Sequence, residues 1–245
     1  MKTLTDTPEE RTATPELHCY AACRPDLAIA GLTGVAGTAV EVLAEGPVAV
    51  LASPLPPGAE LDNEESLAAH ARVVQQAFEA GVVVPLRFPT VAPSRHELRD
   101  QFLQPLRRSI LRALDRLDGH EEVRVRLRYD EDRAVAEVVA GVPRLARLRG
   151  RSDTALALGE AIVAELRHRA GREAGAALKV LRPLCADLEV DALGGEHDVL
   201  VASALVKRGA TDRIAQALQR WAGSRPAVEL QVTGPLPPYS FAELG

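Results

Sequence analysis

The chain has 245 residues, with a hydrophobic fraction of 47% and a charged fraction of 26%, values that suit a globular protein of one large domain or two small ones. Its formal net charge of −5 and aromatic fraction of 3% argue against the basic patches and stacked rings of nucleic-acid-binding proteins. No run approaches the ~20 apolar residues of a membrane span, and the first residues lack the apolar core of a secretory signal. We therefore expect a soluble, intracellular protein that binds neither nucleic acid nor membrane.

The first half of the chain predicts interleaved strands and helices. Residues 1–16 mix charged residues with Thr and Pro and are expected to be a disordered lead-in. Strands are predicted at 17–23, 39–43, 48–52, 82–88 and 123–129, and helices from Glu64 to Gly81 and from Ser94 to Gly119. Pro85 places its strand at an edge or a bulge, Glu97 completes a capping box with Ser94, and Pro105 predicts a kink.

The second half of the chain also predicts alternating helices and strands. Residues 132–152 are poorly patterned, whereas a long helix is predicted over 153–183, strands over 184–190, 198–206 and 228–232, and a helix capped by Thr211 or Asp212. The expected fold is α+β with two small domains. We assign an N-terminal ferredoxin-like domain to 17–131, a linker or helical connection to 132–152, and a C-terminal α+β domain, with a long helix packed on an antiparallel sheet, to 153–245.

No motif in the sequence predicts catalysis, a cofactor or a metal. The three glycines of Gly31–Gly37 have GxxGxxG spacing, which fits neither a dinucleotide fingerprint nor a phosphate loop, so a tight loop is expected. Cys19 and Cys23 share one face of a predicted strand but lie ~13 Å apart at ~3.3 Å per residue, too far to bind one zinc ion together. We expect no catalytic residues, no cofactor-binding residues and no metal ligands.

The closing run Thr233-Gly-Pro-Leu-Pro-Pro-Tyr-Ser-Phe241 is the most unusual segment. Its three prolines predict a stiff, extended, polyproline-like arm, and two of the chain's seven Phe and Tyr residues lie within three positions of each other. Rings of this size either fold back over the core as a lid or are offered to a partner. The candidate partner-binding residues are Pro235, Pro237, Pro238, Tyr239 and Phe241.

This closing run resembles the signature (T/S)GPxPPYSF of the gas vesicle GvpL/GvpF family. Val84-Pro-Leu-Arg-Phe-Pro-Thr-Val91 is similar to a PLRFGT-like stretch of the same family, with Pro89 in place of the usual glycine. His70 lies in a helix that usually carries a histidine, and Glu121-Glu-Val-Arg-Val resembles a Glu-led strand of the family. The resemblances follow the family order from about Leu17 to the end of the chain.

The resemblance implies a non-enzymatic accessory role in gas vesicle assembly, with location in the gas vesicle or the cytoplasm. It implies binding to the hydrophobic shell protein GvpA during vesicle nucleation or growth, contact with other gas vesicle accessory proteins, and presence as a minor vesicle component. The resemblance does not say whether the protein has the role of GvpF or that of GvpL. Two alternatives stay open at this point: a ligand-sensing regulatory protein built from ferredoxin-like domains, and an enzyme whose site is assembled only by the fold.

Overall fold

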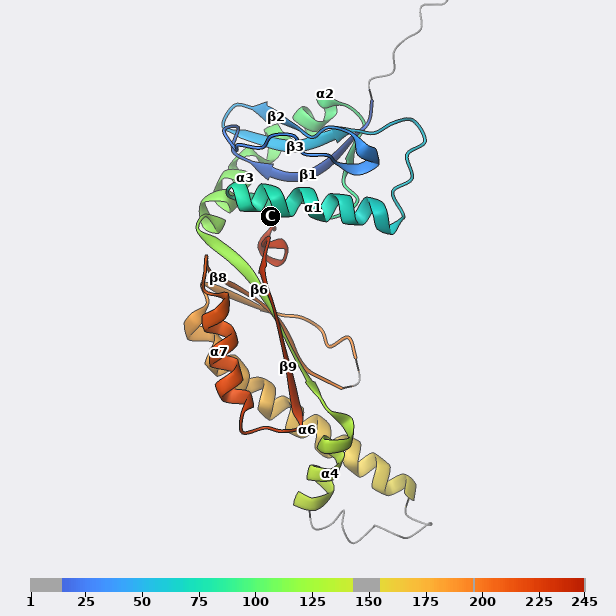
Figure 1. The fold of residues 1–245 in the computed structure, drawn as a ribbon, viewed down its shortest axis with the longest axis vertical. Coiled ribbons are helices and arrows are strands. Elements are labelled where there is room, and N and C mark those ends of the chain that lie inside the picture. The colour runs from blue at the N-terminus through green and yellow to red at the C-terminus, as the bar shows by residue number, and fades with distance from the viewer. Residues whose placement is uncertain (1–14, 143–154, 196, 245) are drawn as a thin grey trace, which may run out of the picture. The chain divides into compact units, whose positions relative to one another are not determined.

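The computed structural model describes residues 15–142, 155–195 and 197–244, and the fold is α+β as predicted (Figure 1). The chain divides into two compact units, each with its own antiparallel sheet. Unit 1 is Met1–Arg116 with Ala242–Gly245, and unit 2 is Leu117–Phe241. The predicted disordered lead-in, apart from Pro15 and Glu16, lies outside the described residues. No helix in the described part of the chain is long and apolar enough to cross a membrane.

Unit 1 contains an antiparallel sheet, and its α-helices come between or after the strands in the sequence. Its elements are β1 (Leu17–Cys23), η1 (Val35–Gly37), β2 (Glu41–Glu45), β3 (Val48–Pro54), α1 (Glu64–Ala80), β4 (Val83–Pro85), β5 (Val91–Ala92), α2 (Arg95–Glu97), the π-helical turn η2 (Leu98–Leu103) and α3 (Gln104–Leu117). The order β2-β3-β1-β4, with β5 also paired to β1, is that of a ferredoxin-like sheet whose first crossover helix is replaced by a loop. The proline-containing strand β4 lies at an edge of the main strand order, as predicted.

The loop that replaces the first crossover helix depends on its glycines. Gly31 and Gly37 adopt positive φ values of 67° and 72°, which side chains with a Cβ rarely tolerate. Gly34 is needed for a different reason, because a Cβ there would overlap the hydroxyl of the buried Tyr20. That hydroxyl accepts the Val35 N–H at 2.7 Å, which fixes the loop to the core. The GxxGxxG run is thus a tight loop.

Local sequence signals set the helix ends in unit 1. Asn63 caps α1 by accepting the Ser66 N–H, and α1 ends at Ala80, just before Gly81. The predicted cap by Ser94 is confirmed, since its hydroxyl accepts the Glu97 N–H at 3.1 Å, and the Glu97 carboxylate reaches back to the Ser94 hydroxyl at 3.3 Å rather than to its backbone N–H. The break expected near Pro105 takes the form of the π-helical turn η2, which ends just before α3 begins.

Unit 2 has the full β-α-β-β-α-β topology. Its elements are β6 (His120–Tyr129), α4 (Glu131–Gly141), α6 (Ala155–Leu181), η4 (Arg182–Leu184), β7 (Asp187–Val190), β8 (Asp198–Lys207), α7 (Thr211–Ala222), β9 (Val228–Leu236) and η5 (Tyr239–Phe241). The strand order β7-β8-β6-β9 repeats, in chain order, the second-third-first-fourth arrangement of unit 1. The ferredoxin-like arrangement, predicted for the N-terminal domain, is therefore more complete in the C-terminal unit.

The division between the units differs from the predicted domain boundary. The sequence pattern assigns the strand at 123–129 to the first domain, but β6 pairs with β8 over residues 120–128 and with β9 over residues 122–129. These long-range pairings make β6 a central strand of the second sheet. The predicted connection 132–152 includes most of α4, and its residues 143–152 lie outside the described residues.

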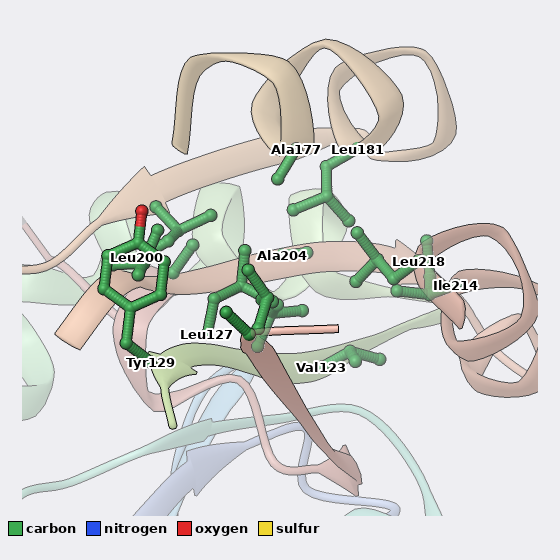
Figure 2. Packing of buried hydrophobic residues seen from close by; sticks show 14 of the residues in the cluster. Val123, Leu127, Tyr129, Ala177, Leu181, Leu200, Ala204, Ile214 and Leu218 are labelled. Carbon is green, nitrogen blue, oxygen red and sulfur yellow. The ribbon is translucent and has the colours of Figure 1, made fainter. Parts of the chain in front are cut away.

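Two helices cover one face of the second sheet. Ala177 and Leu181 of α6, with Ile214 and Leu218 of α7, pack on strand residues such as Leu127 (Figure 2). All five side chains are fully buried. The predicted alternation along β6 is confirmed, because Val123, Val125, Leu127 and Tyr129 point into this core. The arginines between them take structural partners on the other face: Arg126 and Arg128 contact Asp198, and Arg124 contacts Asp191.

Candidate functional site

Two buried glutamates at the start of β6 fix two different segments, the turn into α7 and the C-terminal tail. Glu121 and Glu122 are only 4% and 3% exposed, and by strand alternation they point to opposite faces of the sheet. Glu121 accepts the Thr211 hydroxyl at 2.7 Å and the Gly209 N–H at 3.0 Å. This contact fixes the turn into α7, so the predicted side-chain cap is wrong: the N-cap is Ala210, and Thr211 bonds to Glu121 instead.

Glu122 holds the tail itself. One carboxylate oxygen accepts the Ser240 N–H at 2.8 Å, and the other accepts the Ser240 hydroxyl at 2.9 Å. The Ser240 oxygen lies 2.9 Å from the hydroxyl oxygen of Ser203 on β8. Because a hydroxyl has one proton and a carboxylate only accepts, Ser203 donates to Ser240, which donates to Glu122. We call this three-residue network of Glu122, Ser203 and Ser240 the tail clip.

The tail is folded rather than extended. β9 continues through Leu236, the Gly234–Pro235 peptide bond is cis, and the single turn η5 follows. The prediction of a stiff, polyproline-like arm is therefore wrong, because strand pairing and the tail clip hold this segment back on unit 2. Of the candidate partner-binding residues, Pro237, Pro238 and Phe241 are buried, whereas Pro235 and Tyr239 are exposed.

A second buried polar cluster connects the other family-like motifs in unit 1. His70 of α1 donates from Nε2 to the Leu86 carbonyl at 3.1 Å, so its Nδ1 is free to accept from His18 Nε2 at 2.9 Å. Tyr20 and Phe88 surround the two rings, with centroid distances of 4.8–5.5 Å. His70 thereby ties α1 to the Val84–Val91 segment, in which the Phe88–Pro89 peptide bond is cis.

Both histidines of this cluster are held neutral. Burial, with a smaller contribution from the adjacent His70, lowers the pKa of His18 to about 4. Burial also lowers the pKa of His70, although its bond to the Leu86 carbonyl opposes the shift. The His18 Nδ1 atom has no hydrogen-bond partner among the described residues. The pair therefore acts as a neutral packing element between β1 and α1.

The cysteines are placed as small hydrophobic residues. Cys19 and Cys23 are fully buried, and burial raises the pKa of each thiol to about 12. A thiol with such a pKa is almost wholly protonated at neutral pH and is a poor nucleophile or metal ligand. Among the described residues, no three His, Cys, Asp or Glu side chains are grouped closely enough to hold a metal ion.

The comparisons with known proteins agree on one family. Residues 16–243 match the family model described as "Gas vesicle synthesis protein GvpL/GvpF". Gas vesicle protein F of Streptomyces sp. (strain CB03234) is 31% identical over 214 residues, which cover 83% of this chain and 88% of that protein.

Two crystal structures share the fold. GvpF from Anabaena sp. PCC7120 matches with a TM-score of 0.83 at 20% identity, covering 94% of this chain and 99% of that one. GvpF from Microcystis aeruginosa matches with a TM-score of 0.77 at 18% identity, covering 94% of this chain and 100% of that one. With the family match over almost the whole sequence, the chain belongs to the GvpL/GvpF family of gas vesicle synthesis proteins.

Proposed function

We propose that this protein is a non-enzymatic accessory factor for gas vesicle assembly that binds the hydrophobic shell protein, GvpA, during vesicle nucleation or growth. Membership of the GvpL/GvpF family over residues 16–243 is the observation that carries the proposal. The physical rationale is that a shell subunit with a water-excluding face aggregates unless that face is covered before assembly. The protein would work in the cytoplasm, at the gas vesicle, as a minor vesicle component and with other accessory proteins beside it.

The tail contributes to this proposal in two ways. Its exposed members, Pro235 and Tyr239, are the ones available to touch a partner, and Tyr239 is 37% exposed. Its buried members, Pro237, Pro238 and Phe241, together with the tail clip, hold that short segment in one conformation. A fixed conformation lowers the ordering cost of binding.

The test uses the shell protein co-expressed with the tagged chain. Tyr239→Ala should reduce the amount of shell protein that copurifies, while the exposed Ser224→Ala in the turn after α7 should not. Phe241→Ala is unsuitable as a binding test, because truncating a ring that is 1% exposed costs about 3–5 kcal/mol of stability by itself. The shell-binding proposal fails if the unaltered chain captures no shell protein. The accessory role in assembly fails if deletion of the gene leaves vesicle formation normal in a vesicle-forming host.

A further inference from the structure

Unit 2 has an open groove of about 690 Å³ along α6. Its walls come from α4, from α6, from the segment between β7 and β8, and from the ends of β6 and β8. Most of the lining is apolar, including Val135, Ile162, Val163, Leu166, Val190 and Leu193. Deeper in unit 2, Leu166, Ala170, Ala174 and Leu178 of α6 are only partly buried and pack against the core cluster. The groove therefore opens onto hydrophobic side chains that α4, α6 and the sheet do not cover completely.

Most of the exposed large hydrophobic side chains described in unit 2 lie at or near this groove. Seven large hydrophobic residues are exposed in the described part of the chain, and Val163, Val190 and Leu193, which are 40–54% exposed, line the groove. Leu156, 79% exposed, lies seven residues before Val163 and so on the same face of α6. Gathered rather than scattered exposure is typical of an interaction surface.

The shape of the apolar surface fits an elongated partner. From Leu156 to Leu178 it follows α6 for ~33 Å, at ~1.5 Å per residue. Between Arg167 and Leu178 the helix lines the groove with small residues only, Ala170, Gly171 and Ala174. A Cβ at Gly171 would meet no atom within 4 Å, so the packing of unit 2 does not require glycine there, although glycine inside a helix costs up to ~1 kcal/mol relative to alanine. Small side chains allow a second helix to approach closely.

Most charged side chains that line the groove have partners within the described part of unit 2. Asp198 binds Arg126 through both carboxylate oxygens at 2.9 and 3.0 Å, and Asp191 pairs with Arg124. Glu131 lies 3.5 Å from His197. The exposed Arg167 lines the groove and forms no ion pair with any other described residue. A partner that places a carboxylate beside Arg167 would complete the charge pattern.

We infer that this groove is the docking site for an amphipathic α-helix whose apolar face lies along α6 and whose carboxylate pairs with Arg167. A helix in an apolar groove is a recurring mode of recognition in which a few spaced side chains supply the anchors. The identification of this helix as part of the gas vesicle shell protein rests on the proposed function.

Surface substitutions in the groove test the inference while the fold persists. Val163→Glu places a charge in the apolar stripe, and Arg167→Glu reverses the free cation. The matched controls are Leu67→Glu, at an apolar residue of unit 1 that is 51% exposed, and Arg172→Glu, at an exposed arginine of α6 outside the groove. Each tagged variant is co-expressed with the shell protein, and the copurified amount is measured after fluorescence of the single tryptophan, Trp221, has shown native unit 2.

We expect both groove variants to lower shell-protein capture at least about tenfold, which corresponds to about 1.4 kcal/mol, with both controls within about twofold of the unaltered chain. Recovery of capture by Arg167→Glu, when a carboxylate of the shell helix is changed to lysine, would support the pairing directly. If the unaltered chain captures the shell protein and both groove variants do so equally, the groove inference is overturned while the proposed function stands. If the unaltered chain captures none, both fail.

Other occupants of the groove would also overturn the inference. A second copy would give a dimer by light scattering that Val163→Glu dissociates. A small amphiphile would give an added mass in native mass spectrometry that the same substitution removes.

Discussion

Removal of the Ser240 hydroxyl should loosen the tail and destabilise unit 2. In Ser240→Ala the backbone N–H still reaches Glu122, but the hydroxyl donor to the second carboxylate oxygen is lost. Ser203, which is fully buried, then loses the acceptor for its own proton. A single substitution therefore leaves two buried polar groups short of a partner.

The magnitude follows from the two bonds. A hydrogen bond to a charged group contributes about 1.5–3 kcal/mol and a neutral one about 0.5–1.5 kcal/mol. Since Ser240 is half-buried and water can replace part of the loss, we expect Ser240→Ala to lower the free energy of unfolding by about 2–3 kcal/mol. Glu122→Gln should cost less, about 1 kcal/mol, because the amide can accept the Ser240 N–H while its NH2 donates to the Ser240 oxygen.

The assay is urea unfolding followed by fluorescence of Trp221, which lies in α7 and reports on unit 2 alone. Ser224→Ala, at an exposed serine, is the control and should stay within about 0.5 kcal/mol of the unaltered protein. The double variant of Glu122→Gln with Ser240→Ala should lose less than the sum of the two single losses, since they share one network. A Ser240→Ala loss below about 0.5 kcal/mol would refute the tail clip as an anchor.

Three further predictions concern buried groups elsewhere. Because the fold keeps His18 and His70 neutral while the unfolded chain binds protons below pH about 6.5, the stability of unit 1 should fall as the pH drops from about 6.5 to about 4, by about 3 kcal/mol for His18. Amide exchange in β1 measures this, and a flat profile would contradict it. Cys19 and Cys23 should resist iodoacetamide at pH 8 until the protein is denatured, as mass spectrometry can show. Arg169→Leu removes a guanidinium that binds carboxylates of α4 and α6 at 2.6 and 2.9 Å, and should lower the stability of unit 2 by about 3 kcal/mol in the same urea assay.

Local pattern was sufficient to predict most elements of the fold. The helix from Glu64 ends at Ala80, and the alternation in β6 gives a buried face and a charged face. Pairing between distant strands was not predictable in the same way. The sequence after β6 is weakly patterned, so a boundary there is reasonable on composition, but the partners of β6 lie about 70–110 residues further along the chain, where no local signal points to them.

The conformation of the tail also depends on a contact between residues far apart in the sequence, which local pattern does not reveal. Its prolines predict an extended arm when read alone, because proline restricts φ and removes donors. The residue that decides the conformation is Glu122, 118 positions away, whose carboxylate holds Ser240. Glu122 stands beside Glu121 in a strand that also carries three arginines, so nothing in the local sequence sets it apart from the other charges or says what it binds.

In the tail, the residues that identify the family are mostly not the residues that are exposed to a partner. Most of the residues that make the tail recognisable are buried or hydrogen-bonded within the protein, and its exposed residues are Thr233, Gly234, Pro235 and Tyr239. The groove along α6 offers a larger exposed apolar surface and Arg167, which has no ion-pair partner among the residues that the structure describes. If the two surfaces bind the same partner independently, Tyr239→Ala and Val163→Glu should reduce capture by multiplicative factors; if only the groove binds, the first substitution should change nothing. The pair of variants thus decides whether the recognisable tail belongs to the binding surface or only to the structure that supports it.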